Sequence, residues 1–238
     1  MALPQRAVGE GQAAAPELKN LARPVSLARE RTLPVLPALA GLLPEGGLRR
    51  GSTVTVSGAT SLALALAAGP SQAGSWCAAV GLPSLGLVAA AEVGVVLERF
   101  PLVARPGDEW PAVVAALVDA VDVVLVCLPR HVRSGDARRL VAKARDRGAV
   151  LLTTGGELTA DVRLSVTNCA WEGLGQGHGR LRARRIDVVA TGRGAAARER
   201  RVSLWLPAPD GGIEVVSDRL SCVDAQLLGF NARKSEVS

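Results

Sequence analysis

Apolar runs alternate with polar or glycine-rich connections through most of the chain, and their lengths predict strands and helices in turn. Four short runs rich in apolar and β-branched residues are typical of strands buried in a parallel sheet. They are residues 53–57, 76–80, 121–127 and 149–154. Four other segments have the length and composition of helices. They are residues 61–68, 85–97, 110–120 and 134–147, the last followed by Gly148 as a C-terminal cap.

After residue 154 the pattern changes from this alternation to a series of strands. Residues 162–170, 181–191 and 201–206 are predicted strands joined by glycine-rich turns, which indicates a β-meander. The chain is therefore predicted to fold as an α/β domain of mainly parallel strands flanked by helices, with an antiparallel extension towards the C-terminus. We expect this domain over residues 32–216.

Both ends of the chain differ from this domain. Residues 1–31 mix Ala, Pro and charged residues without periodicity and are predicted to form a flexible arm. Residues 217–238 form a tail with apolar residues at near-helical spacing. Such a tail either lies in a groove of a partner or covers the chain's own core, and both alternatives stay open. Its apolar residues are Leu220, Val223, Leu227, Leu228 and Phe230.

Composition narrows the classes of function. Hydrophobic residues make up 48% of the chain, yet no apolar run reaches the roughly 18 residues of a membrane span, so a cytoplasmic protein is expected. The four cysteines are widely spaced and form no C-x-x-C pair, so we expect no metal and no cofactor. A net charge of +6 admits nucleic acid as a partner, but an arginine-rich surface from a GC-rich genome gives the same charge. With two Phe, four Trp and no Tyr, the chain is poorly equipped to stack bases.

Residues 51–62 have the pattern of a buried strand, a glycine turn and the start of a helix, which is the setting of a Walker A phosphate loop. Such a loop runs G-x-x-x-x-G-K-[ST], and its lysine and backbone N–H groups hold the phosphates. Here Gly58 is followed directly by Ala59, Thr60 and Ser61, so the second glycine and the lysine are missing. Anion binding at the helix N-terminus is one interpretation. A relict turn that only packs is the one we favour.

The order of these segments resembles the core of RecA. Residues 43–51 resemble the lead-in to the first core strand of that family, residues 121–127 its Walker B strand, and residues 160–166 the strand after its second DNA loop. The resemblance extends over about residues 33–206 and implies a RecA-like fold.

Three departures from RecA imply that ATP hydrolysis has been lost. Besides the missing lysine, Cys127 stands where the Walker B strand should end in an acidic residue. Asp122 lies at the start of that strand, five residues earlier, and is too far away to replace it. Residues 80–84 contain no carboxylate where the family places its catalytic glutamate. The resemblance therefore implies no catalytic residue. The segments that correspond to the DNA-binding loops, residues 128–133 and 155–159, are too short for a filament-forming recombinase.

Degenerate RecA-like chains of this size resemble the ImuA-type accessory proteins of bacterial mutasomes. That resemblance implies a non-catalytic scaffold in damage-induced translesion synthesis, associated with the nucleoid when engaged. Its partners would be an inactive Y-family polymerase homologue of the ImuB type and an error-prone replicative-type polymerase, with DNA as a further candidate. Two alternatives stay open: a RecA-family ATPase that borrows a lysine or arginine, and a SulA-type inhibitor of cell division that binds FtsZ.

Cationic residues are the remaining candidates for contacts with a partner or with DNA. Alternation along a strand places Arg180, Arg182 and Arg184 on one face. Phosphate binding, a charged sheet edge that resists aggregation, and docking on an acidic partner are all compatible with such a cluster. The full set of candidates is Arg130, His131, Arg133, Arg180, Arg182, Arg184, Arg193, Arg198, Arg200 and Arg201.

Overall fold

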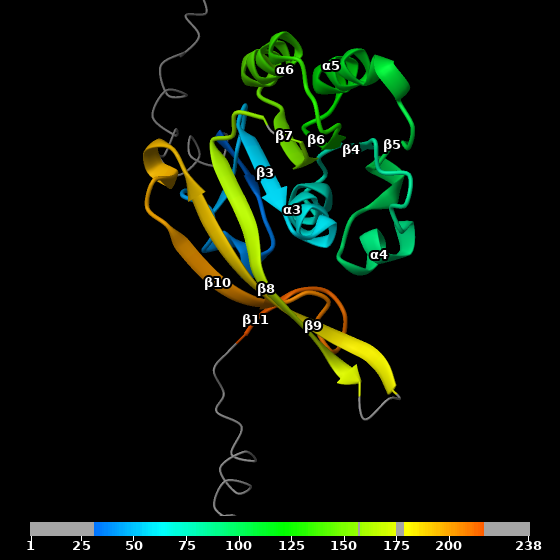
Figure 1. The fold of residues 1–238 in the computed structure, drawn as a ribbon, viewed down its shortest axis with the longest axis vertical. Coiled ribbons are helices and arrows are strands. Elements are labelled where there is room, and N and C mark those ends of the chain that lie inside the picture. Colours follow the sequence, from blue (N-terminus) through cyan, green and yellow to red (C-terminus); the bar gives the residue numbers. More distant parts are fainter. Residues whose placement is uncertain (1–30, 157, 175–178, 217–238) are drawn as a thin grey trace, which may run out of the picture.

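The computed structural model describes residues 31–156, 158–174 and 179–216, which form a nine-stranded mixed sheet and a separate two-stranded sheet (Figure 1). The strands of the large sheet are β3 (Thr53–Ser57), β4 (Cys77–Val80), β5 (Leu102–Val103), β6 (Val123–Leu128), β7 (Val150–Gly155), β8 (Val162–Leu174), β9 (Gly179–Gly192), β10 (Arg200–Trp205) and β11 (Glu214–Val215). The small sheet pairs β1 (Thr32–Pro34) with β2 (Gly47–Arg49). The α-helices are α2 (Pro37–Ala40), α3 (Thr60–Gln72), α4 (Leu87–Glu92), α5 (Trp110–Ala120) and α6 (Ser134–Arg147), and the short 3-10 turns are η2 (Leu97–Arg99), η3 (Gly107–Glu109) and η4 (Gly194–Ala196).

The large sheet has a parallel half and an antiparallel half. Its order is β11-β10-β9-β8-β3-β7-β6-β4-β5. Strand β3 lies between β7 and β8 and is parallel to both, and β6 is parallel to its neighbours β4 and β7. Strands β8 to β11 pair antiparallel in succession. The prediction of an α/β fold with antiparallel strands at the C-terminal end is confirmed.

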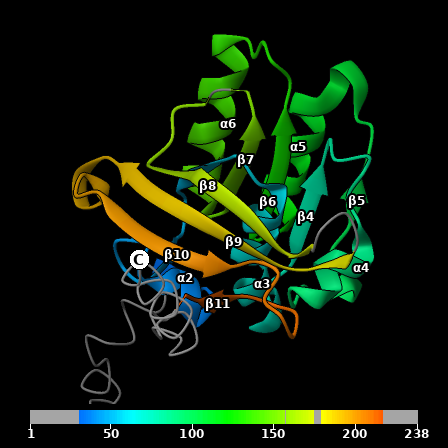
Figure 2. The ribbon, with the colours of Figure 1, turned by 60° about the horizontal axis from the view of Figure 1, so that its bottom comes forward.

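Helices cover both faces of the parallel half (Figure 1, Figure 2). On one face lies α3, in which every residue from Leu62 to Ser71 is buried. Burial on all sides explains why the sequence of this helix is apolar all round. On the other face lie α5 and α6, whose Val114 and Leu140 join the core formed with β6 and β7. The parallel half of the sheet is thus held between two helical layers.

The predicted strands are all present, but two helix predictions are wrong in extent. Helix α3 continues past residue 68 to Gln72, so Gly69 does not end the helix. Gly69 instead lies against the backbone of Val35, because a Cβ at position 69 would be 2.5 Å from Val35 Cα. The helix predicted over 85–97 is limited to α4, because the chain turns at Gly94 with φ of +104°. Helices α5 and α6 have the predicted bounds, and Gly148 caps α6 with φ of +72°.

Strands β8 and β9 continue beyond the end of β3 as a projecting ribbon, here defined as residues 167–174 and 179–187, and at its base residues 185–187 still pair with β10. Pairing of β8 with β3 ends at Ser165, whereas its pairing with β9 continues to Leu174. The ribbon therefore extends past the carboxyl end of β3 (Figure 1). Trp171 and Leu181 are exposed on it. Among the helices of the described residues, none has the length and apolar character needed to cross a membrane.

Candidate functional site

The glycine turn joins β3 to α3 at the carboxyl edge of the parallel strands. Gly58 has φ of +91°, and a Cβ there would lie 2.9 Å from the Cβ of Val166 on β8. Both the backbone angle and this contact require glycine. Ala59 occupies the N-cap position of α3 and offers no side-chain hydrogen bond to the first turn. The turn is therefore packed against the neighbouring strand.

A guanidinium group stands at the N-terminal turn of α3. Arg184 on β9 donates a hydrogen bond to Ser61 Oγ, and its Nε donates another to the Leu206 carbonyl oxygen at 2.8 Å. Its Cζ lies 5.4 Å from the centre of the Trp171 ring on β8. A cation is disfavoured at the positive end of a helix dipole, so the contacts with Leu206 and Trp171 stabilise it there. The turn carries a fixed positive charge although the lysine is missing.

The end of β6, where a Walker B acid would stand, is occupied by Cys127. This residue packs against the larger core and pairs in register with Thr154. A Cβ at Gly155 would lie 3.5 Å from its Sγ, and a Cβ at Gly81 would lie 2.9 Å from its carbonyl oxygen. Thr154 Oγ1 is buried and has no hydrogen-bond partner in the described part of the chain. These residues offer neither a metal-binding carboxylate nor a general base.

Asp122 lies at the opposite end of the same strand. It precedes β6, and its carboxylate forms an ion pair of 2.8 Å with Arg50. At about 3.3 Å per residue, the strand separates it from Cys127 by about 16 Å. Within the described ranges, no group of three His, Cys, Asp or Glu side chains is placed to hold a metal ion.

The cationic residues of the sequence prediction lie in separate places. Arg130, His131 and Arg133 are exposed in the loop from β6 to α6. Arg180 and Arg182 are exposed on the projecting ribbon. Arg184 is half-buried and hydrogen-bonded to α3, and a register shift between Glu172 and Leu174 separates it from Arg180 and Arg182.

The remaining cations surround the connection from β9 to β10. Arg193 follows Arg180 by 13 positions, which corresponds to about 43 Å along the strand at about 3.3 Å per residue. Arg200 donates hydrogen bonds to the carbonyl oxygens of Arg198 and Ala195 at 3.3 and 3.4 Å, and Arg201 pairs with Glu199 at 2.6 Å. The arginines of β9 and of this connection therefore form two clusters at opposite ends of a long strand. The apolar residues predicted as a partner-binding tail lie outside the described residues, as does the N-terminal arm up to residue 30.

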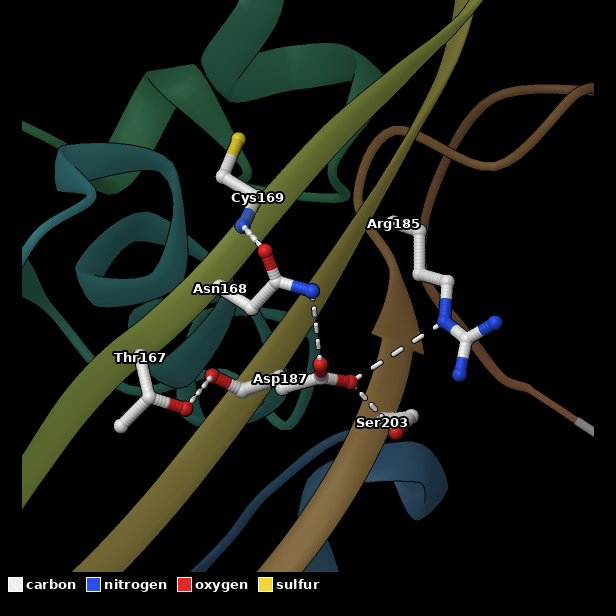
Figure 3. A network of polar contacts seen from close by, with 6 residues as sticks. All are labelled: Thr167, Asn168, Cys169, Arg185, Asp187 and Ser203. Atoms are coloured by element: carbon white, nitrogen blue, oxygen red, sulfur yellow. Dashed lines mark hydrogen bonds and ion pairs between the residues drawn. The ribbon is translucent and has the colours of Figure 1, made fainter.

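A polar network fixes the base of the ribbon, and the sequence analysis missed it (Figure 3). Asp187 accepts hydrogen bonds from Ser203 Oγ at 2.6 Å and Asn168 Nδ2 at 3.1 Å, with Arg185 Nε 4.0 Å away. The hydrogen bond from Ser203, followed by that from Asn168, lowers the pKa of Asp187. The network lies at a register shift between Val166 and Asn168, where β8 bends. Only the register between three strands brings these side chains together.

Comparison with known proteins relates this chain to one family and to one curated protein. Residues 41–160 match the MT3502 N-terminal domain. The chain is also 36% identical over 162 residues to the uncharacterized protein Rv3395c of Mycobacterium tuberculosis (strain ATCC 25618 / H37Rv), an alignment that covers 66% of this chain and 79% of that protein. The matched domain contains the glycine turn and Cys127, whereas Arg184 and the ribbon lie beyond it.

Proposed function

The chain belongs to the MT3502 N-terminal domain family, and we propose that it is a non-catalytic RecA-like scaffold of a translesion DNA synthesis complex. The arrangement of the glycine turn carries this proposal. Gly58 is packed against Val166, and Arg184 is hydrogen-bonded to the first turn of α3. Cys127 stands where the metal-binding acid would be needed. A RecA-like site would need a lysine after Gly58 and an acid at position 127 to hydrolyse ATP, and this chain has Ala59 and Cys127 there.

The topology of the sheet supports the RecA-like part of the proposal. The glycine turn follows β3, which lies in the middle of the sheet between β7 and β8. Helix α3 then crosses one face of the sheet, and α5 and α6 return on the other. In open α/β sheets this carboxyl edge is where ligands bind. We infer that a domain of this kind, with its glycine turn packed against β8, serves to hold other proteins rather than a nucleotide.

The proposed protein partners are an inactive Y-family polymerase homologue of the ImuB type and an error-prone replicative-type polymerase. A scaffold needs accessible surfaces of fixed shape. The projecting ribbon is one such surface, because it exposes Trp171, Leu181 and two arginines outside the compact part of the sheet. DNA is a further proposed ligand of the cationic residues, which places the complex at the nucleoid when it is engaged.

Co-expression tests this function against cell-division inhibition. The chain is produced with the ImuB-type homologue of the same bacterium, and separately with its FtsZ, and each mixture is analysed by size-exclusion chromatography with light scattering. We expect a complex that contains the polymerase homologue and none that contains FtsZ. A complex with FtsZ alone, or no complex in either mixture, would contradict the proposal.

One observation favours a second candidate function, nucleotide binding by an unconventional route. The guanidinium of Arg184 puts a positive charge beside the N-terminal turn of α3, which is where a phosphate would need one. In that case Arg184 would leave Ser61 and bind the phosphate. An enzyme built in this way would still lack a metal-binding acid near Cys127, so we rank this function below the scaffold.

A further inference from the structure

A hollow of about 620 Å³ lies between α6, the connection from β7 to β8 and the end of β9. Helix α6 is the outer helix of its layer on this side, and α5 lies beyond it (Figure 1, Figure 2). Apolar side chains line part of the hollow: Val132 from the loop before α6, Ala137 and Val141 from α6, and Leu158 from the connection. Val132, Ala137 and Val141 are partly buried against the core of the domain and Leu158 is buried, so the hollow offers only a small apolar surface.

Arginines line the same hollow. Arg138 and Arg145 come from α6, two helical turns or about 10.5 Å apart. Arg193 reaches the hollow from the end of β9. In the described part of the chain, none of these three guanidinium groups takes part in an ion pair or a side-chain hydrogen bond, and no described residue of the lining is acidic.

The other side of α6 is different. There Lys143 and Arg147 both pair with Asp119 of α5, at 2.6 and 2.9 Å, and these contacts lower the pKa of the carboxyl group, with the hydrogen bond from Lys143 as the largest cause. In the described part of the chain, the two cations that face α5 thus share a carboxylate partner, whereas the three arginines that face the hollow have none. Arg138 and Arg145 are exposed, so their charge is available to a partner that carries negative charge.

We propose that this hollow docks an acidic, amphipathic segment of a partner protein. Its apolar side chains contact Val132 and Val141, and its carboxylates pair with Arg138, Arg145 and Arg193. A partner helix with acidic residues seven positions apart has the same spacing of about 10.5 Å as the two arginines of α6. Nucleic acid fits less well, because its backbone would leave the apolar lining without contacts and no aromatic residue of the described chain lines the hollow for stacking. This proposal rests on the proposed scaffold function in one respect: a scaffold binds a protein partner, and that partner would provide the acidic segment.

The test uses a fluorescent amphipathic peptide of about 18 residues, with Leu on one face and Glu seven positions apart beside it. A copy with Gln in place of every Glu is its control. Fluorescence anisotropy measures binding to the chain and to the double variant Arg138→Ala/Arg145→Ala. We expect the double variant to bind the Glu peptide about tenfold more weakly, as the loss of two exposed ion pairs implies.

Matched variants distinguish binding at this hollow from attraction by the overall positive charge of the chain. Arg105→Ala/Arg139→Ala removes the same charge; Arg139 is on α6 but lines a different hollow, and Arg105 is exposed before η3. This control should keep the parent affinity. Val141→Asn changes no charge and should still weaken binding of the Glu peptide. Thermal unfolding of each variant checks that the domain remains folded.

Several results would overturn the proposal. One is equal weakening by the two double variants, another is equal binding of the Glu and Gln peptides, and a third is the absence of peptide binding. A mixed-sequence single strand of about 20 nucleotides is titrated in parallel. If its binding depends on Arg138 and Arg145 but not on Val141, the hollow is a nucleic-acid site and the proposal is wrong. Co-elution of the parent chain with the polymerase homologue is measured separately, so failure of the docking site is distinguishable from failure of the scaffold function.

Discussion

Replacement of Gly58 by alanine measures how firmly β8 closes the glycine turn. The first cost is the backbone angle: an L-residue at the φ of +91° found here loses about 1–2 kcal/mol. The second is contact, because the new Cβ would lie 2.9 Å from Val166 Cβ and 3.3 Å from its carbonyl oxygen. Forcing these atoms apart costs about 1–3 kcal/mol. The free energy of unfolding should therefore fall by about 2–5 kcal/mol, a large share of the usual total of about 5–15 kcal/mol.

Urea unfolding followed by circular dichroism gives this free energy. Gly74→Ala is the matched control, because Gly74 has φ of +96° and nothing within 4 Å of its Cβ position. It should lose only the backbone part, about 1–2 kcal/mol. Val166→Gly removes the atom that a Cβ at position 58 meets first. The double variant Gly58→Ala/Val166→Gly should therefore be more stable than the sum of the single variants predicts, by about 0.5–3 kcal/mol.

Two results would refute this reasoning. If Gly58→Ala and Gly74→Ala lose the same stability, the contact with β8 has no cost and the turn is open. If the effects of Gly58→Ala and Val166→Gly simply add, the two residues are not in contact. Either result would mean that the glycine turn is not closed by β8 and has room to bind an anion.

Three other predictions concern side chains away from Gly58. Arg184→Ala removes two hydrogen bonds and a contact with an aromatic ring, so we expect a loss of about 1–2 kcal/mol in urea unfolding, and a gain in stability would contradict the contacts described. Burial raises the pKa of the Cys77 thiol to about 12, so iodoacetamide mapped by mass spectrometry should leave Cys77 unmodified in the folded chain while labelling the exposed Cys169. The lowered pKa of Asp187 means that its stabilisation is present above the unfolded value of about 3.9 and disappears as the pH falls through the folded value. The urea midpoint of Asp187→Asn should therefore lie below that of the parent at neutral pH and approach it on acidification, and a gap that widens in acid would show the sign to be wrong.

The parallel half of the fold was accessible from sequence because local signals determine it. Strand β6 is a continuous apolar run, and α6 combines an amphipathic pattern with a glycine that ends it. The bounds of α3 were not accessible in this way. Gly69 and Pro70 look like a helix end, but Gly69 is there so that the backbone of Val35 can pass close to α3, and a contact between such distant segments leaves no local trace.

The candidate site was only half visible in the sequence. The absence of a lysine after Gly58 and the presence of Cys127 can be found by inspecting the sequence. The structure places Gly58 and Cys127 at the carboxyl edge of the sheet. The role of Arg184 could not be found, because its place opposite Trp171 depends on the register of β8 with β9, and two irregularities shift that register. Strand alternation predicted one face for Arg180, Arg182 and Arg184. It gave no sign that Arg184 is half-buried against α3 while the other two arginines are exposed.

Calorimetric titration of the chain with ATP and magnesium tests the central claim, that the glycine turn no longer serves a nucleotide. The account predicts no saturable heat up to about millimolar nucleotide, a concentration that would reveal even weak sites. It predicts the same for Arg184→Ala, since removing the guanidinium restores neither the lysine nor the metal-binding acid. Saturable, magnesium-dependent binding by the parent chain that is lost in Arg184→Ala would contradict the account, because it would make Arg184 the cation of a working phosphate site.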